Sequence, residues 1–506
     1  MEYILDAWSA GYVDKYTIEE CNVLGEVLME RAAQALVKEI VKRHDNSAKV
    51  LCVAGKGNNG GDAVVAAGLL REGGYNVEII EIKNVKSKDY FEEIKDYGYE
   101  VVVDGLFGIG LNKPVQGVYL SAVNYINRCR EHGSKVYAVD IASGINSSTG
   151  EVMGTCVNAD YTVTFGYKKV GHVVYPGKEY TGKLSVHDIG FCDKATENTE
   201  VVNRQGYGFD NPYEALKYLP ERKSDSNKGS YGKVLVVAGC DEMPGACILA
   251  SKSALRSGCG LVTACSSEKV LNAVVVAVPE VILMNSNREF QIEKYSACLI
   301  GPGLGKSFQS KMLVENVILN YKHTEENRIP EDKGFKGLVI DADAINILAE
   351  KMNELGIYER NERLEYIESN LPDNTVFTPH KKELSRLFNI SMDEFDSLIY
   401  TAQWLRNRTN KVFVLKDAAT IVVGRNKLYI NQTGNNGMST AGAGDVLAGI
   451  IVSFIAQQSD VFTAACVGVC LHGHAGDKAR DKYSEYGVIA GDISDAIAEV
   501  MYAAVK

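Results

Sequence analysis

Short apolar runs rich in β-branched residues recur along the chain, and they lack the polar alternation of a strand exposed on one face. Strands of this kind are buried on both sides, which is typical of a parallel sheet covered by helices. Helical patterns separate the runs, so the sequence predicts an α/β fold. In the first part of the chain we expect strands at 48–54, 76–82, 100–104 and 135–140, helices at 62–72, 88–97 and 116–131, and an irregular, β-rich segment at 159–189.

The same alternation restarts after a polar, turn-rich stretch at 222–230, RKSDSNKGS. A chain of 506 residues is longer than a single core usually supports. We therefore expect two α/β domains, 1–210 and 211–506, with the boundary near 205–215. The second is predicted to contain strands at 232–238, 260–265, 297–300, 337–341, 375–378 and 411–415, a hairpin at 419–431, and helices at 246–257, 445–456, 461–480 and 489–504.

Charge and hydropathy exclude several classes of function. The net charge of −11 argues against a nucleic-acid scaffold or a protein that binds anionic membranes. Pro279 and Glu280 interrupt the longest apolar run, Ala273–Met284, so we expect no transmembrane helix. The 12 cysteines form no CxxC pair and no secretory signal opens the chain, so we expect a cytoplasmic protein with reduced, buried thiols.

Polar residues follow three of the first four predicted strands. Gly55–Asp62 (GKGNNGGD) follows the first, Asp104 ends the third, and Asp140 leads to Ser143 after the fourth. Ligands bind outside the carboxyl ends of parallel strands, so these groups should meet at one edge. The GxGxxG pattern alone is a weak dinucleotide fingerprint, because Asn-Gly-Gly-Asp follows where an apolar helix face is usual. Asn59, Asp104 and Ser143 could supply oxygen ligands to a hard cation; alternatively, they only shape turns and cap helices.

The second domain has no GxxxxGK[ST] motif and is therefore no P-loop protein. Gly442, Ala443 and Gly444 instead precede Asp445 at the start of a predicted helix. Small residues let backbone N–H groups approach an anion at a helix N-terminus. An aspartate beside that anion can take a proton from a hydroxyl group. The pattern favours a small-molecule kinase site of the ribokinase-like kind, with a turn and N-cap as the simpler alternative.

Two other groups allow more than one interpretation. Asp341 and Asp343 could serve Mg²⁺ or a ligand, or they could cap a helix. Cys466, Cys470 and His474 share one helical face, but the outer two lie about 12 Å apart along a helix. That separation is too large for one metal ion, so we expect packing rather than a metal site.

The first domain resembles the NAD(P)H-hydrate epimerases through the ordered motifs GKGNNGGD, VDGLFGIGL, AVDIASGINSSTGEV and ADYTVTFGYKKVGHVVYPGKEYTGKLSV. The resemblance implies a Rossmann-like three-layer αβα sandwich. It also implies K⁺ at Asn59, Asp104 and Ser143, and Asp140 at the reacting ring. Ala142 and Ala63 depart from the family's usual Pro and Gly but remove no ligating side chain. The implied contacts to the hydrate are Asn58, Asn59, Gly60, Gly61, Asp62, Gly108, Ile109, Gly110, Leu111, Asn112, Lys113 and Pro114.

The second domain resembles the ADP- or ATP-dependent NAD(P)H-hydrate dehydratases of the ribokinase-like superfamily, through IGPGLG, VIDADAINIL, TPHKKELSRL, VLKDAATIVV and GMSTAGAGDVLAG. The resemblance implies Asp445 as catalytic base and Mg²⁺ with the nucleotide. Asp417 replaces the usual Gly, and we expect its side chain to point away from the nucleotide. The implied hydrate contacts are Ala246, Gly303, His380 and Asp445, and the implied nucleotide contacts are Lys416, Asp417, Ala418, Ala419, Thr420, Gly442 and Gly444.

Together the two resemblances imply a bifunctional repair enzyme for hydrated NADH and NADPH. The first domain would interconvert the R and S hydrates, and the second would dehydrate the S form with ADP or ATP, ADP being favoured. We expect a homo-oligomer that binds neither nucleic acid nor membrane. Two alternatives are a vitamin or sugar kinase fused to a NAD-binding regulatory domain, and a non-catalytic dinucleotide sensor.

Overall fold

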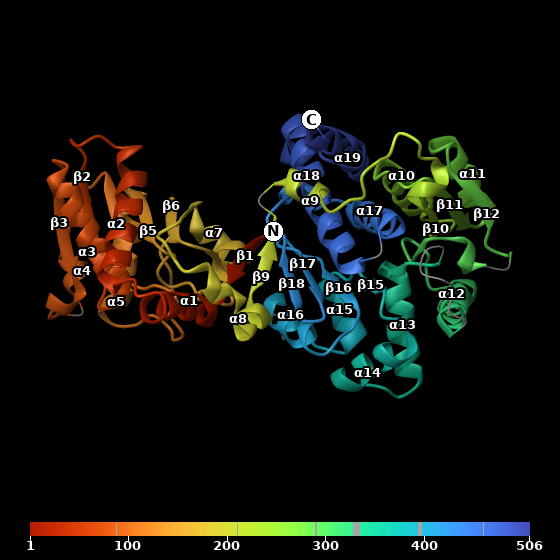
Figure 1. Ribbon diagram of the computed structural model, residues 1–506, viewed down its shortest axis with the longest axis horizontal. Helices are drawn as coiled ribbons and strands as arrows, with labels where there is room; N and C mark the ends of the chain where they lie inside the picture. Colours follow the sequence, from red (N-terminus) through yellow and green to blue (C-terminus); the bar gives the residue numbers. More distant parts are fainter. Residues whose placement is uncertain are drawn as a thin grey trace. The chain divides into compact units, whose positions relative to one another are not determined.

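The computed structural model describes the chain except residues 88, 210, 289–290, 327–333, 393–396, 459 and 506. It divides into two compact units, which Figure 1 shows in red to yellow and in green to blue. The N-terminal unit comprises Glu2–Tyr207, and the C-terminal unit comprises Gly208–Lys506 with Met1.

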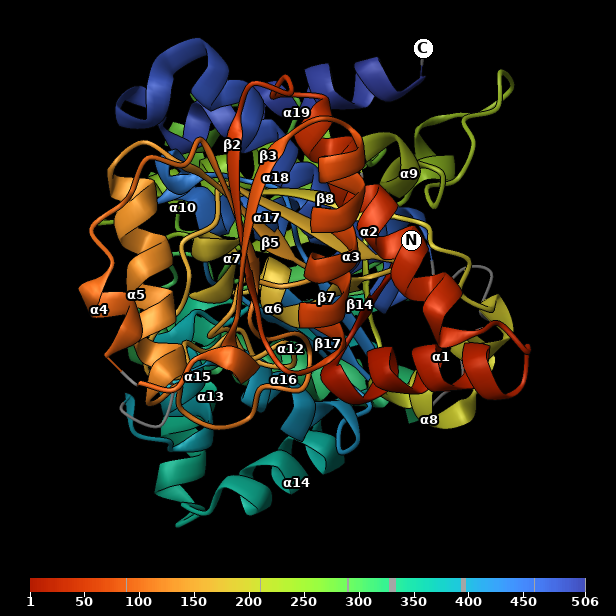
Figure 2. The same ribbon diagram turned by 90° about the vertical axis from the view of Figure 1, so that its left-hand side faces the viewer.

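The N-terminal unit is built on a parallel sheet with the strand order β3-β2-β4-β5-β6-β8. Alternate side chains of its strands enter two different cores. Val50 and Cys52 pack with α2 and α3 on one face, whereas Leu51 and Val53 pack with α5 on the other. Figure 2 shows α5 on one side of β2 and β3, and α2 and α3 on the other. This is a three-layer αβα sandwich, as the sequence predicts.

The elements of this unit are β1(Glu2–Leu5), α1(Ala7–Glu19), α2(Gly25–Val41), β2(Lys49–Ala54), α3(Asn58–Glu72), β3(Asn76–Glu81), η1(Ile82–Asn84), α4(Tyr90–Glu93), β4(Val101–Gly105), α5(Val118–Glu131), β5(Lys135–Val139), β6(Tyr161–Phe165), β7(Lys168–Lys169), α6(Val170–Val173), α7(Gly177–Thr181), β8(Lys183–His187), η2(Asp193–Glu197), α8(Thr199–Arg204) and β9(Gly206–Gly208), the last crossing the boundary. β1 pairs in parallel with β7.

One helix prediction in this unit is wrong, and a second helix is present but starts earlier than predicted. The helix expected at 88–97 is a single turn, α4, because only Phe91 of that turn is buried and the chain becomes extended at Ile94; residue 88 lies outside the described residues. The helix expected at 62–72 begins earlier, at Asn58, so half of the supposed glycine loop is helical. The N–H groups of Gly60 and Gly61 donate to the carbonyl of Gly57, at 3.0 and 3.2 Å, and extend the helix toward the strand.

The C-terminal unit contains a second sheet, in which β12, β11, β10, β13, β14, β15 and β16 are parallel neighbours in that order. The hairpin β17–β18 continues it antiparallel. Its largest core joins these strands to α10, α17, α18 and α19. Every strand predicted here is present. β12 was not predicted, because it lies in the same apolar run as the end of α11.

The elements are α9(Pro212–Leu216), η3(Lys228–Tyr231), β10(Lys233–Val237), α10(Pro244–Arg256), β11(Leu261–Ser266), α11(Glu268–Ala277), β12(Ile282–Asn285), η4(Ile292–Lys294), β13(Ala297–Ile300), α12(Phe308–Glu326), β14(Gly337–Ile340), α13(Ala342–Glu354), α14(Arg360–Asn370), β15(Thr375–Phe377), α15(Lys381–Phe388), α16(Leu398–Arg406), β16(Val412–Leu415), β17(Ile421–Gly424), β18(Lys427–Ile430), η6(Asn436–Met438), α17(Ala443–Gln457), α18(Val461–Gly487) and α19(Ala490–Val505).

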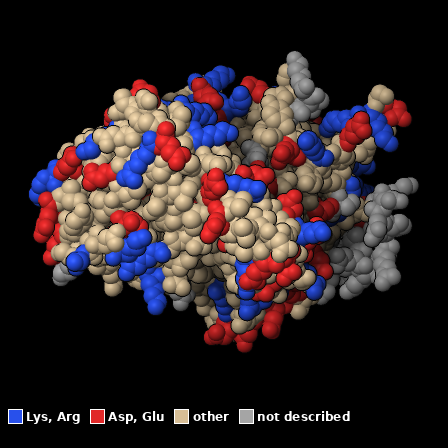
Figure 3. Space-filling view, turned by 60° about the vertical axis from the view of Figure 1, so that its left-hand side comes forward, with Lys and Arg blue, Asp and Glu red and all other residues tan. Residues whose placement is uncertain are grey.

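The distribution of charged side chains and the hydropathy of the helices can be compared with the expectations from the sequence. Acidic and basic side chains are interspersed over the face drawn in Figure 3. Within the described part of the chain, no helix combines the length and the hydropathy that a bilayer span requires.

Candidate active sites

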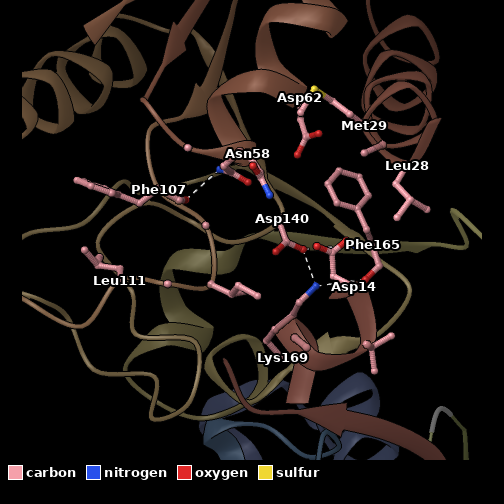
Figure 4. Close-up of a pocket in the computed structure, with 18 of the residues that line it drawn as sticks. Asp14, Leu28, Met29, Asn58, Asp62, Phe107, Leu111, Asp140, Phe165 and Lys169 are labelled. Carbon is pink, nitrogen blue, oxygen red and sulfur yellow. Dashed lines mark hydrogen bonds and ion pairs between the residues drawn. The ribbon is translucent and has the colours of Figure 1, made fainter. Parts of the chain in front are cut away.

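A cavity of about 740 Å³ opens in the N-terminal unit at the carboxyl edge of its sheet (Figure 4). Helices α1 and α2, the first turn of α3 and the loop after β4 form its walls, together with residues from the end of β6 to β7. Of the predicted contacts, the cavity is lined by Asn58, Asn59, Asp62, Gly108, Ile109, Gly110, Leu111, Asn112, Lys113 and Asp140.

Gly60, Gly61 and Pro114 do not line this cavity. The two glycines are needed for packing: a Cβ at Gly60 would lie 2.2 Å from the carbonyl oxygen of Gly55, and one at Gly61 would lie 2.6 Å from Cε of Met29. This close approach brings the first turn of α3 against the end of β2. Asn58 and Asn59, the first two residues of α3, line the cavity, so an anion bound there would meet the N-terminus of this helix.

Asn59, Asp104 and Ser143 meet behind this wall. Ser143 donates to Asp104 through its N–H (2.8 Å) and its Oγ (2.6 Å). Asn59 Nδ2 donates to the carbonyl of Phe107 at 2.9 Å, and the Phe107 N–H donates to Ser143 Oγ at 2.9 Å. Asp104 is fully buried, and burial raises its pKa to about 6 although these hydrogen bonds and one from Leu106 oppose the rise.

The Asp104 cluster fits a monovalent cation. Among the described residues, Asp104 accepts hydrogen bonds from Ser143 and Leu106 but forms no ion pair with a Lys, Arg or His side chain. Asp104, Ser143 Oγ, the Phe107 carbonyl and the amide oxygen of Asn59 are hard oxygen donors with one net charge.

Asp140 follows β5 with a left-handed backbone, φ 62°. Lys169 Nζ lies 2.5 Å from its Oδ1, and Thr164 Oγ1 donates to the same oxygen at 2.8 Å. His172 bridges the backbones of Lys169 and Asp140. Its Nδ1 accepts from the Lys169 N–H (3.0 Å), and its Nε2 lies 2.9 Å from the Asp140 carbonyl oxygen. Burial is the largest single cause and would raise the pKa of the Asp140 carboxyl, but Lys169, together with His172 and Thr164, lowers that pKa on balance.

Two further carboxyls face the same cavity, Asp62 from α3 and Asp14 from α1. Neither forms a hydrogen bond or ion pair with any residue that the structure describes. Burial, followed by the negative charges of Asp140 and Asp14, raises the pKa of Asp62 to about 8. Burial and Asp140 also raise the pKa of Asp14.

In the C-terminal unit, α17 starts at Ala443, two residues before the predicted start, so Asp445 lies in its first turn. Gly442 is left-handed at the N-cap, with φ 89°. A Cβ at Gly444 would lie 3.4 Å from Lys416 Nζ, so this lysine extends over the helix N-terminus. Ammonium and backbone N–H groups together form a site for an anion.

Asp445 belongs to a group of acids around Lys416. Lys416 Nζ lies 2.9 Å from Asp341 Oδ1 and 3.9 Å from Glu383 Oε2. Burial is the main cause that raises the pKa of Asp445, to about 7; Asp341, Asp343 and Glu383 add to the rise, and Lys416 opposes it. A carboxyl with a pKa near neutrality is suited to take up and release a proton.

The remaining predicted contacts of this unit lie near the ends of its helices and strands, with Ala246 in the first turn of α10 and His380 at the N-cap of α15. His380 Nδ1 accepts from the N–H groups of Lys382 and Glu383, so it caps α15 while about half of its side chain stays exposed. A Cβ at Gly303 would lie 2.6 Å from the Cβ of Ala246, which shows that these two residues touch. Lys416–Thr420 follows β16.

Asp417, Asp341 and Asp343 each have separate partners. Asp417 pairs with Lys381 Nζ at 2.7 Å, which neutralises the unexpected acid. Asp341 accepts from Thr378 Oγ1 at 2.6 Å, besides contacting Lys416, and Asp343 accepts from the Gly305 N–H at 2.8 Å.

Among the described residues, no group of three or more His, Cys, Asp or Glu side chains is arranged to hold a metal ion. Cys466 and Cys470 are buried in α18, as the helical spacing predicts.

Sequence reasoning did not single out Lys169, Asp14 or Glu383. Lys169 lies in the quoted motif TFGYKKVG, where a lysine beside an apolar strand was the available signal. Glu383 stands three residues after His380, the spacing of a helix capping box. Asp14 lies in a helix that gave no chemical signal.

The fold and the two sites define an α/β enzyme with two separate sites for small polar ligands. The chain matches the family described as NAD(P)H-hydrate dehydratase over residues 234–499, and YjeF-related protein N-terminus over residues 25–95 and 80–171. The bifunctional NAD(P)H-hydrate repair enzyme Nnr of Thermofilum pendens is 32% identical, covering 94% of this chain and 92% of that protein. The Nnr of Coxiella burnetii is also 32% identical, over 92% and 93%.

A solved structure of ADP/ATP-dependent NAD(P)H-hydrate dehydratase from Bacillus subtilis, crystallised with ATP and Mg²⁺, is 26% identical with a TM-score of 0.47; the match covers 59% of this chain and 98% of that one.

The chain belongs to the family of bifunctional NAD(P)H-hydrate repair enzymes. The family and the pairing of epimerase with dehydratase that the motifs predict are thereby confirmed.

Proposed function

We propose that residues 1–210 form the epimerase and residues 211–506 the ADP-dependent dehydratase, so that together they return both hydrates of NADH and NADPH to the intact cofactor. Family membership over nearly the whole chain carries this proposal. The division of the structure at Tyr207 and Gly208 supports the assignment of one activity to each unit.

In the epimerase unit, the hydrate occupies the cavity. Its phosphates meet the N–H groups at the start of α3, and its nicotinamide ring meets Asp140. Asn58–Asp62 and Gly108–Pro114 shape the two walls, Gly60 and Gly61 by permitting the close packing described above. Apolar side chains such as Phe165 and Leu28 also line the cavity and would exclude water from the ring.

K⁺ is the cation proposed for the site behind this wall, held by Asn59, Asp104, Ser143 and the carbonyl of Phe107. Bound there, it supplies a positive charge for Asp104. These residues connect the start of α3 to the loops after β4 and β5, and so they hold the two cavity walls formed by α3 and the loop after β4 in register.

In the dehydratase unit, Asp445 takes the proton of the C6 hydroxyl as its oxygen attacks the terminal phosphoryl group of the nucleotide. The bridging P–O bond breaks, and the nucleotide leaves one phosphate shorter, as AMP when ADP is the donor. The N–H groups of Gly442–Gly444 and the Lys416 ammonium stabilise the negative charge on that phosphoryl group. The C6–O bond then breaks with phosphate as the leaving group, loss of a ring proton restores the double bond, and hydrolysis of the nucleotide makes the reaction irreversible.

Ala246, Gly303 and His380 bind the hydrate in this proposal, and Lys416–Thr420 with Gly442 and Gly444 bind the nucleotide. Mg²⁺ accompanies the phosphates of the nucleotide and needs only one or two protein carboxylates. We assign Asp343 to that metal, since Asp341 already pairs with Lys416 and Asp445 serves as the base. We expect ADP as the preferred nucleotide and a homo-oligomer in the cytoplasm.

The experiment is incubation with mixed-epimer NADHX, with and without ADP, following the absorbance of restored NADH. The parent should consume both epimers only with ADP. Asp445→Asn should lose dehydration and keep epimerisation, while Asp140→Asn should consume the S form and leave most of the R form. Dehydration by Asp445→Asn at the parent rate would refute the assigned base.

A further inference from the structure

Three carboxyls from different elements face the cavity of the N-terminal unit, and they differ in their charge partners. Asp140, after β5, touches the ammonium of Lys169. Asp62, in the first turn of α3, is nine-tenths buried and contacts no cation among the described residues. Figure 4 shows the carboxyls of Asp62 and Asp140 separated within the cavity, with Lys169 beside Asp140 and away from Asp62.

We propose that Asp62 and Asp140 are an acid and base pair that inverts C6 of the hydrate by removing water from one face of the ring and adding it to the other. The inference rests on the proposed function of this unit and assigns two further roles. Lys169 positions and ionises Asp140, and Asp14 keeps Asp62 protonated.

The step balances without an oxidant or reductant. Asp62 gives its proton to the C6 hydroxyl, and the C6–O bond breaks with its electron pair leaving on water. The lone pair of N1 forms a double bond to C6, which leaves a planar ring cation. A water molecule then adds to the opposite face of C6 and gives its proton to Asp140. Asp140 releases that proton to solvent, and Asp62 takes one up.

The charges around the two carboxyls favour these roles. Lys169 lowers the pKa of Asp140, so the base is ionised at neutral pH. Burial raises the pKa of Asp62 to about 8, with Asp140 from β5 and Asp14 from α1 as the charged groups that face it, so the acid is protonated at neutral pH. Carboxyls with pKa values displaced in opposite directions are the arrangement that acid and base catalysis at one pH requires.

Loss and return of water predict an isotopic result. Epimerisation of purified R hydrate in H₂¹⁸O, without ADP, should introduce one ¹⁸O for each inversion, seen as a mass increase in the S product. Opening of the ring at N1–C6 instead keeps the original oxygen on C6. Inversion that runs well ahead of ¹⁸O incorporation would overturn the proposal.

Variants test the assignment of Asp62. Asp62→Asn should slow epimerisation by about 10²–10⁴-fold, with the KM for the hydrate little changed. Glu72→Gln, at the exposed far end of α3, is the matched control and should keep the parent rate. An Asp62→Asn enzyme that epimerises within threefold of the parent would refute the role of Asp62.

The pH profile separates catalysis from structural damage. Epimerisation by the parent should fall as the pH rises through about 8, because the acid form of Asp62 is lost. Asp14→Asn removes a negative charge facing Asp62, which should lower the pKa of Asp62 and move this alkaline limb of the pH profile to lower pH. A limb that does not move would contradict the role assigned to Asp14. If the parent does not epimerise the hydrate at all, the proposed function of this unit is refuted. If both the parent and the Asp62→Asn variant are active, only the acid role of Asp62 is refuted.

Discussion

Replacement of Asp445 by Asn should stabilise the C-terminal unit at the same time as it abolishes dehydration. The carboxyl has a pKa of about 7 in the folded unit, against an ordinary value of 3.8 for an aspartate in water. Its charged form is therefore disfavoured by folding. The penalty is absent below pH 3.8, grows as the pH rises, and is complete above about pH 7.

The size of the effect follows from the shift. Each pKa unit corresponds to 1.36 kcal/mol, so the full shift is roughly 4 kcal/mol. Because the Asp445 side chain keeps some contact with solvent, we expect about 2 kcal/mol at pH 8, and about half of that at pH 5.5. For a unit of this size, the gain at pH 8 raises the melting temperature by about 4 °C.

Calorimetry without ligands at pH 8 and pH 5.5 measures this gain, and the transition of the N-terminal unit serves as an internal reference. Asp225→Asn, an exposed acid in the C-terminal unit, is the matched control and should leave the melting temperature unchanged. Equal melting temperatures for Asp445→Asn and the parent at pH 8, or a gain that does not vary with pH, would show that folding does not raise the pKa of Asp445.

Three other changes probe different parts of the molecule. Gly442→Ala places a Cβ 2.5 Å from Leu249 Cδ1 at a left-handed φ of 89°; it should cost about 1–2 kcal/mol of stability and raise the KM for ADP, and an unchanged KM would separate this glycine from the nucleotide. Asp104→Asn, or K⁺ replaced by choline, should slow epimerisation while dehydration of pure S hydrate continues; equal rates in K⁺ and choline would refute a cation site. Lys411 is fully buried with Nζ 2.8 Å from Asp373 Oδ1, so Lys411→Met should lower the free energy of unfolding by about 1–3 kcal/mol in urea titrations, without affecting epimerisation.

Local periodicity was enough to predict most of the two sheets, since strands buried on both faces leave continuous apolar runs. It failed where one run contained two elements. Ala273–Met284 holds the end of α11 and most of β12, and only Pro279 and Glu280 mark the change between them. It failed also for α4, because a helical pattern does not persist where one side chain alone, Phe91, has a core to enter.

The start of α3 shows how tertiary contact overrides local preference. Glycine is a poor helix former, so GNNGGD reads as a loop. Glycine is nevertheless required at Gly60, because a Cβ there would lie 2.2 Å from the Gly55 carbonyl oxygen. The lower helix propensity is the cost of packing this turn against the end of β2. The sequence contains the glycines, but the neighbour that requires them is found only in the folded chain.

The same limit applies to the charges at the two sites. Asp140 and Asp445 were recognisable because each follows a marked turn, but the sequence does not show which cation each of them faces. Lys169, 29 residues after Asp140, ionises its partner through direct contact. Lys416 pairs instead with Asp341 and leaves Asp445 with a pKa of about 7. Burial raises the pKa of Asp445 more than the charge of Lys416 lowers it, whereas the contact with Lys169 helps to lower the pKa of Asp140 despite burial. A closer lysine at Asp445 should therefore change its proton affinity. Asp341→Asn should free Lys416 to pair with Asp445, lower the pKa of Asp445 and move the acid limb of dehydration to lower pH. A limb that stays near pH 7 in this variant would show that Lys416 does not control the base.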